Sequence, residues 1–194
     1  MTRNRLEAFS DGVIAIIITI MVLELRPPQG VGLADLGPLV PKILSYVLSF
    51  VFLAIYWNNH HHLLHAVQRV DGRVLWANVH LLFWLSLVPF VTAWMGEHGA
   101  APATVAAYGA VLLFSGVAYF LLTLALRRLH GKDSVLARAL GADWKGKASV
   151  VAYAAAIPLA FIDRWAAVAI YVAVALVWLV PDRRIERVLG TRGE

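Results

Sequence analysis

The chain has 194 residues, of which 60% are apolar and 15% are charged, and its formal net charge is +5. A soluble domain is closer to half apolar and a quarter charged, so this composition indicates a membrane protein and excludes an ordinary soluble domain. The sequence contains no cysteine, which excludes structural disulfides and thiolate metal sites.

Apolar stretches follow one another along the whole chain. There are six, at about residues 6–25, 39–57, 74–95, 103–126, 148–162 and 165–180. Each approaches the roughly 20 residues with which a helix crosses about 30 Å of hydrocarbon, although the last two are short. We therefore predict an all-α membrane protein with six transmembrane helices, in a single domain that covers residues 1–194.

The basic residues orient this predicted bundle. If the six spans alternate in direction, one side of the membrane receives Arg3, Arg5, Arg69, Arg73, Arg127, Arg128, Lys132, Arg138, Lys145, Lys147, Arg183, Arg184, Arg187 and Arg192. The other side receives only Arg26, Lys42 and Arg164. The positive-inside rule then places both termini in the cytoplasm of a multi-pass protein, which we expect in a bacterial inner (plasma) membrane. Topology thus explains the positive charge, and no nucleic-acid partner is needed.

The first span has an unusual arrangement of polar residues. Arg5 and Phe9-Ser10-Asp11 precede a twelve-residue run in which Thr19 is the only polar residue. In a helix, Ile16, Thr19 and Leu23 fall at i, i+3 and i+7 and share one face. Identical copies of that face around an axis would form an apolar tube with a ring of hydroxyl groups. Periodicity alone also allows a lipid-facing or helix-packing stripe.

This segment resembles the transmembrane protein 175 family of potassium channels. The family motif is an arginine, three residues, Phe-Ser-Asp, and a helix that reads roughly Gly-Val-Phe-Ala-Ile-Ala-Ile-Thr-Leu-Leu-Val-Leu-Glu. The matching residues are Arg5, Phe9, Ser10, Asp11, Gly12, Ile16, Thr19, Leu23 and Glu24, whereas Ile14 and Ile17 depart from the pattern. Two further resemblances cover Tyr56-Trp57-Asn58 with His60-His61, and Asn78 through Leu87-Val88-Pro89-Phe90 to Gly96-Glu97. Together they cover roughly the first hundred residues, and the rest matches only in hydropathy.

The resemblance implies a potassium-permeable cation channel and no enzyme activity. Its pore would be lined by the first helix of each subunit of a homotetramer in the lipid bilayer, with Ile16 as a hydrophobic gate, Thr19 in a ring near the potassium ion, and Leu23 as a further pore level. It also implies a supporting structural network of Arg5, Phe9, Ser10, Asp11, Trp57, His60 and His61. The implied partners are monovalent cations and other copies of the chain, with no cofactor besides the transported potassium.

The polarity of the helices also favours an assembly of several subunits around one pore. Six helices with one weakly polar face offer no evident hydrated path within one subunit, whereas copies of that face around an axis do. The sequence has no Gly-rich carbonyl filter, so selectivity would come from a narrow apolar constriction with threonine hydroxyls. We therefore expect modest discrimination of potassium over sodium.

A histidine-rich run in residues 58–65 is the main candidate for a metal site. His61 and His65 lie at i and i+4 and could face one ion. However, the run contains no acidic residue, and His80, His98 and His130 are scattered singly. A catalytic or transport metal usually adds a carboxylate or a third ligand borne on a helix. We therefore predict no metal site and assign these histidines to the membrane interface and the structural network.

Two other classes of protein stay open. A secondary ion or proton transporter would have inverted repeats, broken helices and charges buried at the bilayer midplane. A membrane metal protein or enzyme would need reactive groups clustered at one depth, for which the histidine run is the candidate. Single-channel currents would distinguish a channel from both.

Overall fold

The protein is a bundle of helices in the computed structural model, which describes residues 2–131 and 143–179. The helices, in chain order, are α1 (Arg3–Leu23), a 3-10 helix η1 (Leu33–Leu39), α2 (Val40–His65), α3 (Gly72–Ser86), α4 (Val88–Glu97), α5 (Pro102–His130), α7 (Trp144–Leu159) and α8 (Arg164–Leu179). No strand occurs within these two ranges. The prediction of an all-α fold is therefore confirmed for the described residues.

Among residues 2–131 and 143–179, four helical segments are long and apolar enough to cross a membrane. They are α1, η1 with α2, α3 with α4, and α5, and the predicted spans 6–25, 39–57, 74–95 and 103–126 fall on them. The predicted spans 148–162 and 165–180 fall on α7 and α8, which have only 16 residues each. The crossing of the membrane by this last hairpin, and hence the count of six spans, stays a prediction.

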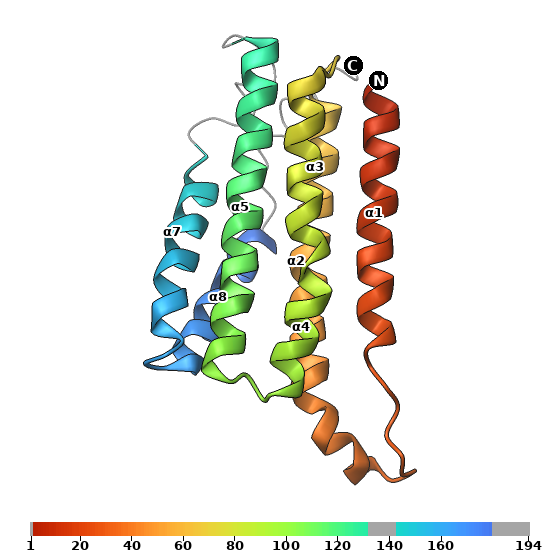
Figure 1. The fold of residues 1–194 in the computed structure, drawn as a ribbon, viewed down its shortest axis with the longest axis vertical. Coiled ribbons are helices and arrows are strands. Elements are labelled where there is room, and N and C mark those ends of the chain that lie inside the picture. Colours follow the sequence, from red (N-terminus) through yellow and green to blue (C-terminus); the bar gives the residue numbers. More distant parts are fainter. Residues whose placement is uncertain (1, 132–142, 180–194) are drawn as a thin grey trace.

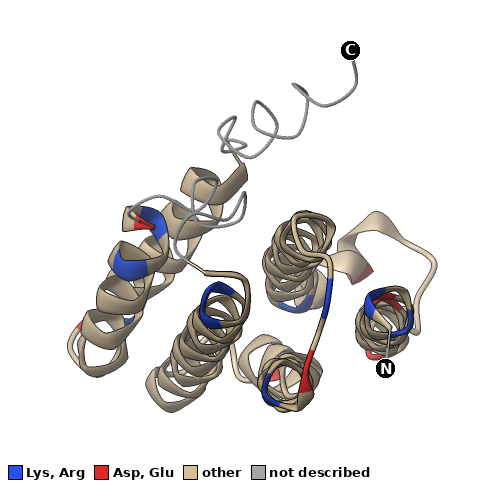
Figure 2. Ribbon diagram, turned by 90° about the horizontal axis from the view of Figure 1, so that it is seen from above, with Lys and Arg blue, Asp and Glu red and all other residues tan. Residues whose placement is uncertain are grey.

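The helices lie side by side, with α1 at one edge of the subunit and the α7–α8 hairpin at the other (Figure 1). α1 packs against α2, α3 and α4, and α5 packs against α3, α4, α7 and α8. The view from above shows α1, beside the N-terminus, at the edge of the bundle (Figure 2). This position leaves one side of α1 without a neighbour among the described residues of its own subunit.

The third span is interrupted where α3 passes into α4. Its start is capped by Asp71, whose side chain accepts a hydrogen bond from the backbone N–H of Val74 at 2.9 Å. α3 ends at Ser86, and Pro89 stands in the first turn of α4. Proline has no N–H to donate to the carbonyl oxygen of Leu85, four residues earlier, and its ring clashes with that carbonyl group, so the helix is interrupted here.

Buried polar side chains join α2 to α4 and α5, and α5 to α8. The hydroxyl of Ser49 on α2 is 2.7 Å from that of Thr92 on α4 and 2.9 Å from that of Tyr108 on α5, and all three residues are buried. At Gly109 of α5 the Tyr171 ring of α8 comes so close that an added Cβ would overlap its hydroxyl. That hydroxyl donates to the carbonyl oxygen of Val105 at 3.1 Å.

Basic side chains gather at one end of the bundle, which we call the basic end. Here α1 begins, α2 ends, α3 begins, α5 ends and α7 begins (Figures 1 and 2). The described basic residues of this end are Arg3, Arg5, Arg69, Arg73, Arg127, Arg128, Lys145 and Lys147. The others predicted for it, Lys132, Arg138, Arg183, Arg184, Arg187 and Arg192, lie outside the described residues. Lys42, at the start of α2, lies at the opposite end and forms an ion pair with Glu97 at 3.1 Å.

Candidate pore helix and its supports

α1 has one exposed face and one buried face. The buried face carries Leu6, Ser10, Ile14, Ile17 and Met21. The departures from the family motif, Ile14 and Ile17, thus both lie on the packing face.

On the exposed face, Phe9, Ile16 and Leu23 follow one another at intervals of seven residues. Seven residues make nearly two helical turns, so these side chains form one line along the helix. They are 52%, 59% and 76% exposed in the subunit. This line is a continuous apolar surface that a neighbouring molecule could cover.

Thr19 lies one turn from Ile16 on the same side of α1 and is exposed. Its hydroxyl donates a hydrogen bond to the carbonyl oxygen of Ile16 at 2.9 Å. The hydroxyl proton is thereby engaged by the helix itself, and the lone pairs of the oxygen stay available to a hydrogen-bond donor or to a cation.

A chain of buried hydrogen bonds holds the opposite face of α1. The Ser10 hydroxyl donates to the carbonyl oxygen of Leu6 at 2.8 Å and accepts from the Asn78 amide nitrogen at 2.9 Å. The amide oxygen of Asn78 lies 2.7 Å from Nε2 of His60. Because an amide oxygen only accepts, Nε2 carries the proton in this arrangement. Ser10, Asn78 and His60 are each 0% exposed, so the chain connects α1, α3 and α2 without access to water.

A second contact joins α1 to α2 nearer the surface. The indole N–H of Trp57 donates to Oδ1 of Asp11 at 3.0 Å. Arg5 is exposed, and no ion pair between its guanidinium and Asp11 occurs among the described residues. Of the predicted network, the structure thus joins Asp11 with Trp57 and, through Asn78, Ser10 with His60, whereas Arg5 and Phe9 stand apart.

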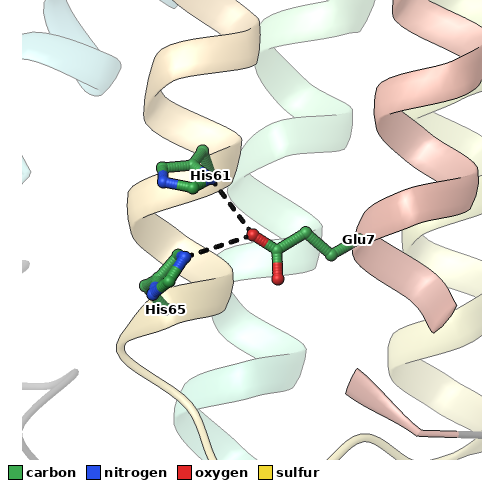
Figure 3. Close-up of side chains that lie close together, drawn as sticks. All are labelled: Glu7, His61 and His65. Atoms are coloured by element: carbon green, nitrogen blue, oxygen red, sulfur yellow. Dashed lines mark ion pairs between the residues drawn. The ribbon is translucent and has the colours of Figure 1, made fainter. Parts of the chain in front are cut away.

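The remaining member of the predicted network, His61, contacts a residue that sequence reasoning left out. Oε1 of Glu7 is 3.1 Å from Nδ1 of His61 and 3.4 Å from Nε2 of His65 (Figure 3). Glu7 precedes Ser10 by three residues and therefore shares its helix face. This spacing in the sequence could have indicated that Glu7 faces α2. Asn78 lay within a matched segment, but nothing in its own sequence neighbourhood indicated its role.

Charged side chains do not line the core. Among the described residues, the buried polar side chains are all Ser, Thr, Asn or His, and no Asp, Glu, Lys or Arg is buried. His60 is the ionisable member of this set, and buried ionisable groups also occur in transporters, so the transporter alternative stays open.

Known proteins resemble the chain over nearly its full length. The family model described as endosomal/lysosomal potassium channel TMEM175 matches residues 5–89. A potassium channel of Chryseobacterium sp. (strain P1-3) is 49% identical over 97% of this chain and 98% of its own length. A potassium channel of Streptomyces collinus is 35% identical over 60% of each chain.

A solved structure agrees with the fold. The crystal structure of a lysosomal potassium-selective channel TMEM175 homologue from Chamaesiphon minutus is 30% identical to this chain, with a TM-score of 0.78. The match covers 92% of this chain and 96% of that one, so the likeness extends beyond the first hundred residues.

The fold and these relatives define an all-α membrane protein of a potassium-channel class. The chain belongs to the TMEM175 family.

Proposed function

We propose that this chain is the subunit of a potassium-permeable channel in which identical copies, as a homotetramer, surround a pore lined by α1. One observation carries the proposal: α1 stands at the edge of the subunit, with one face held by buried hydrogen bonds and the other a line of exposed apolar side chains. Relatives that are named potassium channels support the same assignment. A symmetric assembly is the natural way to cover a face that every copy leaves exposed.

Ile16 is the proposed gate. A ring of branched apolar side chains on the symmetry axis blocks ions by excluding water from a short stretch of the pore. Ile16 lies in the middle of the exposed line, between Phe9 and Leu23, and is therefore deepest in the membrane of the three. Leu23 forms a further apolar level toward the end of α1.

Thr19 is the proposed selectivity residue. Potassium gives up part of its hydration when it enters a narrow apolar pore, and oxygen atoms must replace the lost water. The Thr19 hydroxyl donates to its own helix, so a ring of these groups would present oxygen lone pairs to the axis. A single ring of neutral hydroxyls suits modest discrimination of potassium over sodium.

The buried contacts of α1 are proposed to fix its rotation. A turn of the helix by one residue moves a side chain by about 100° around the axis, which would take Ile16 and Thr19 off the pore. Such a turn would also break the hydrogen bonds of Ser10 to Asn78 and of Asp11 to Trp57. With the basic end on the cytoplasmic side, as the positive-inside rule requires, these supports lie at the cytoplasmic half of a pore in the inner membrane.

Flux measurements on the reconstituted protein test this proposal. With potassium on one side and sodium on the other, Thr19→Val should shift the reversal potential toward zero, whereas Thr19→Ser, which keeps the hydroxyl, should retain the parent's value. An unchanged reversal potential in an assembled Thr19→Val channel would refute the hydroxyl ring.

Cation flux into vesicles that contain the reconstituted protein tests the gate. Ile16→Asn should raise cation flux because the constriction then wets more easily. The matched control is Leu176→Asn at the other edge of the subunit, since Leu176 is 58% exposed and Ile16 is 59% exposed. Equal flux changes in both variants would mean a general leak and not a gate.

A further inference from the structure

We propose that Glu7, His61 and His65 form a binding site for a divalent transition-metal ion of the zinc class, which clasps the start of α1 to the end of α2. The three side chains point toward one another from two helices (Figure 3). The site is separate from the pore face of α1 and does not depend on the proposed channel function. The sequence predicts no metal site because the histidine run contains no carboxylate, and Glu7 supplies one from the neighbouring helix.

The distances between the donor atoms suit one ion. Oε1 of Glu7 is 3.1 Å from Nδ1 of His61 and 3.4 Å from Nε2 of His65. Zn²⁺ binds nitrogen and oxygen at about 2.0 to 2.1 Å, so the corners of its tetrahedron are about 3.3 Å apart. All three donor atoms lie within 4.8 Å of one another. A small rotation of the histidine side chains would therefore bring their two nitrogen atoms to the distance that one ion requires.

The kinds of donor atom indicate which ions would bind. Two imidazole nitrogens and one carboxylate oxygen suit Zn²⁺, Co²⁺, Ni²⁺ and Cu²⁺, whereas Mg²⁺ and Ca²⁺ prefer oxygen ligands only. The two histidine side chains are 39% and 46% exposed, so the ion can enter from solution. A water molecule can then complete the fourth position.

The position of the site gives it a mechanical role. Glu7 lies one turn before Ser10 on the packing face of α1, and His61 directly follows His60 on α2. An ion held by Glu7 and the two histidines would tie together the same two helices as the buried hydrogen-bond chain. Metal binding should thus stabilise the folded subunit, since the unfolded chain cannot present the Glu7 carboxylate and the two imidazoles together.

Binding of the metal alone tests the proposal. Tag-free protein in detergent, freed of metal with a chelator, is titrated with ZnCl₂ in a calorimeter, and CoCl₂ is added separately to record its visible absorption. We expect one Zn²⁺ per chain with micromolar affinity, Co²⁺ absorption bands typical of four ligands, and a higher melting temperature with Zn²⁺ than with MgCl₂.

Three variants locate the ion. Glu7→Gln and His65→Gln should each weaken Zn²⁺ binding by at least about 10-fold and abolish the Co²⁺ bands. His98→Gln, at the opposite end of the bundle, should bind like the parent. Either ligand variant suffices if the other does not fold. Parent protein without stoichiometric binding, or a folded Glu7→Gln or His65→Gln variant that binds like the parent, would overturn the site.

Discussion

Replacing Asn78 by leucine tests whether the buried hydrogen-bond chain holds α1 in place. Asn78 donates to Ser10 at 2.9 Å and accepts from His60 at 2.7 Å, and all three residues are fully buried. Leucine has a branched side chain of similar length, so the change removes both hydrogen bonds and leaves little cavity. Ser10 keeps its bond to its own helix, but the Nε2–H of His60 loses its acceptor.

The magnitude of the loss follows from these contacts. A buried donor left without a partner costs about 1 to 3 kcal/mol. Hydrogen bonds between membrane helices average only about 0.6 kcal/mol, because the unfolded state within the membrane also finds partners. We expect Asn78→Leu to lower the free energy of unfolding by about 2 kcal/mol, with most of that loss from the unpaired histidine nitrogen.

Unfolding in mixed micelles with increasing sodium dodecyl sulfate, followed by tryptophan fluorescence, measures this free energy. Ser86→Ala on the same helix is the matched control, because the Ser86 hydroxyl is exposed and donates to the carbonyl oxygen of Phe83 within α3. It should change the free energy by less than about 0.5 kcal/mol.

A double-mutant cycle decides whether the loss passes through His60. His60→Leu combined with Asn78→Leu removes both polar partners, which is far less costly than leaving one of them unpaired. The double variant should therefore lose at least about 1 kcal/mol less than the sum of the two single losses. Additive losses, or a single Asn78→Leu variant as stable as the parent, would refute this account of the network.

Other contacts of the bundle predict further losses of stability. Gly109→Ala should destabilise the subunit by about 1 to 3 kcal/mol, because the new methyl group displaces the Tyr171 hydroxyl; unfolding in mixed micelles measures it, and an unchanged midpoint would show that α8 shifts freely. Ser49→Ala should cost about 1 kcal/mol by removing the shared partner of two buried hydroxyls, and a gain in stability would contradict this. Trp57→Phe removes the hydrogen bond to Asp11, which we expect to support α1. The variant should lower the thermal stability of the assembled protein without moving its potassium–sodium reversal potential. A loss of selectivity at normal stability would instead place Asp11 in the permeation path.

The sequence determined the local properties of the chain. Hydropathy and length predicted an all-α membrane protein and the first four spans, because a helix of about 20 apolar residues satisfies its own backbone in the membrane wherever it stands. Alternation of the spans predicted which helix ends lie together, and the distribution of lysine and arginine predicts that the basic end faces the cytoplasm. The motif from Arg5 to Glu24 was enough to indicate the family, and the comparisons confirm it.

The tertiary structure alone decided which side of α1 is buried and which residues meet there. Ile14 and Ile16 have the same side chain, yet one is 1% exposed and the other 59%. Hydropathy cannot separate them, because lipid is as apolar as the interior of the bundle.

The same is true of the polar contacts. Asn78 meets Ser10 across 68 residues of sequence, and Glu7 completes the cluster with His61 and His65 from another helix. A carboxylate or an amide forms hydrogen bonds only with groups within about 3 Å of it. The packing of the helices decides which residues come that close.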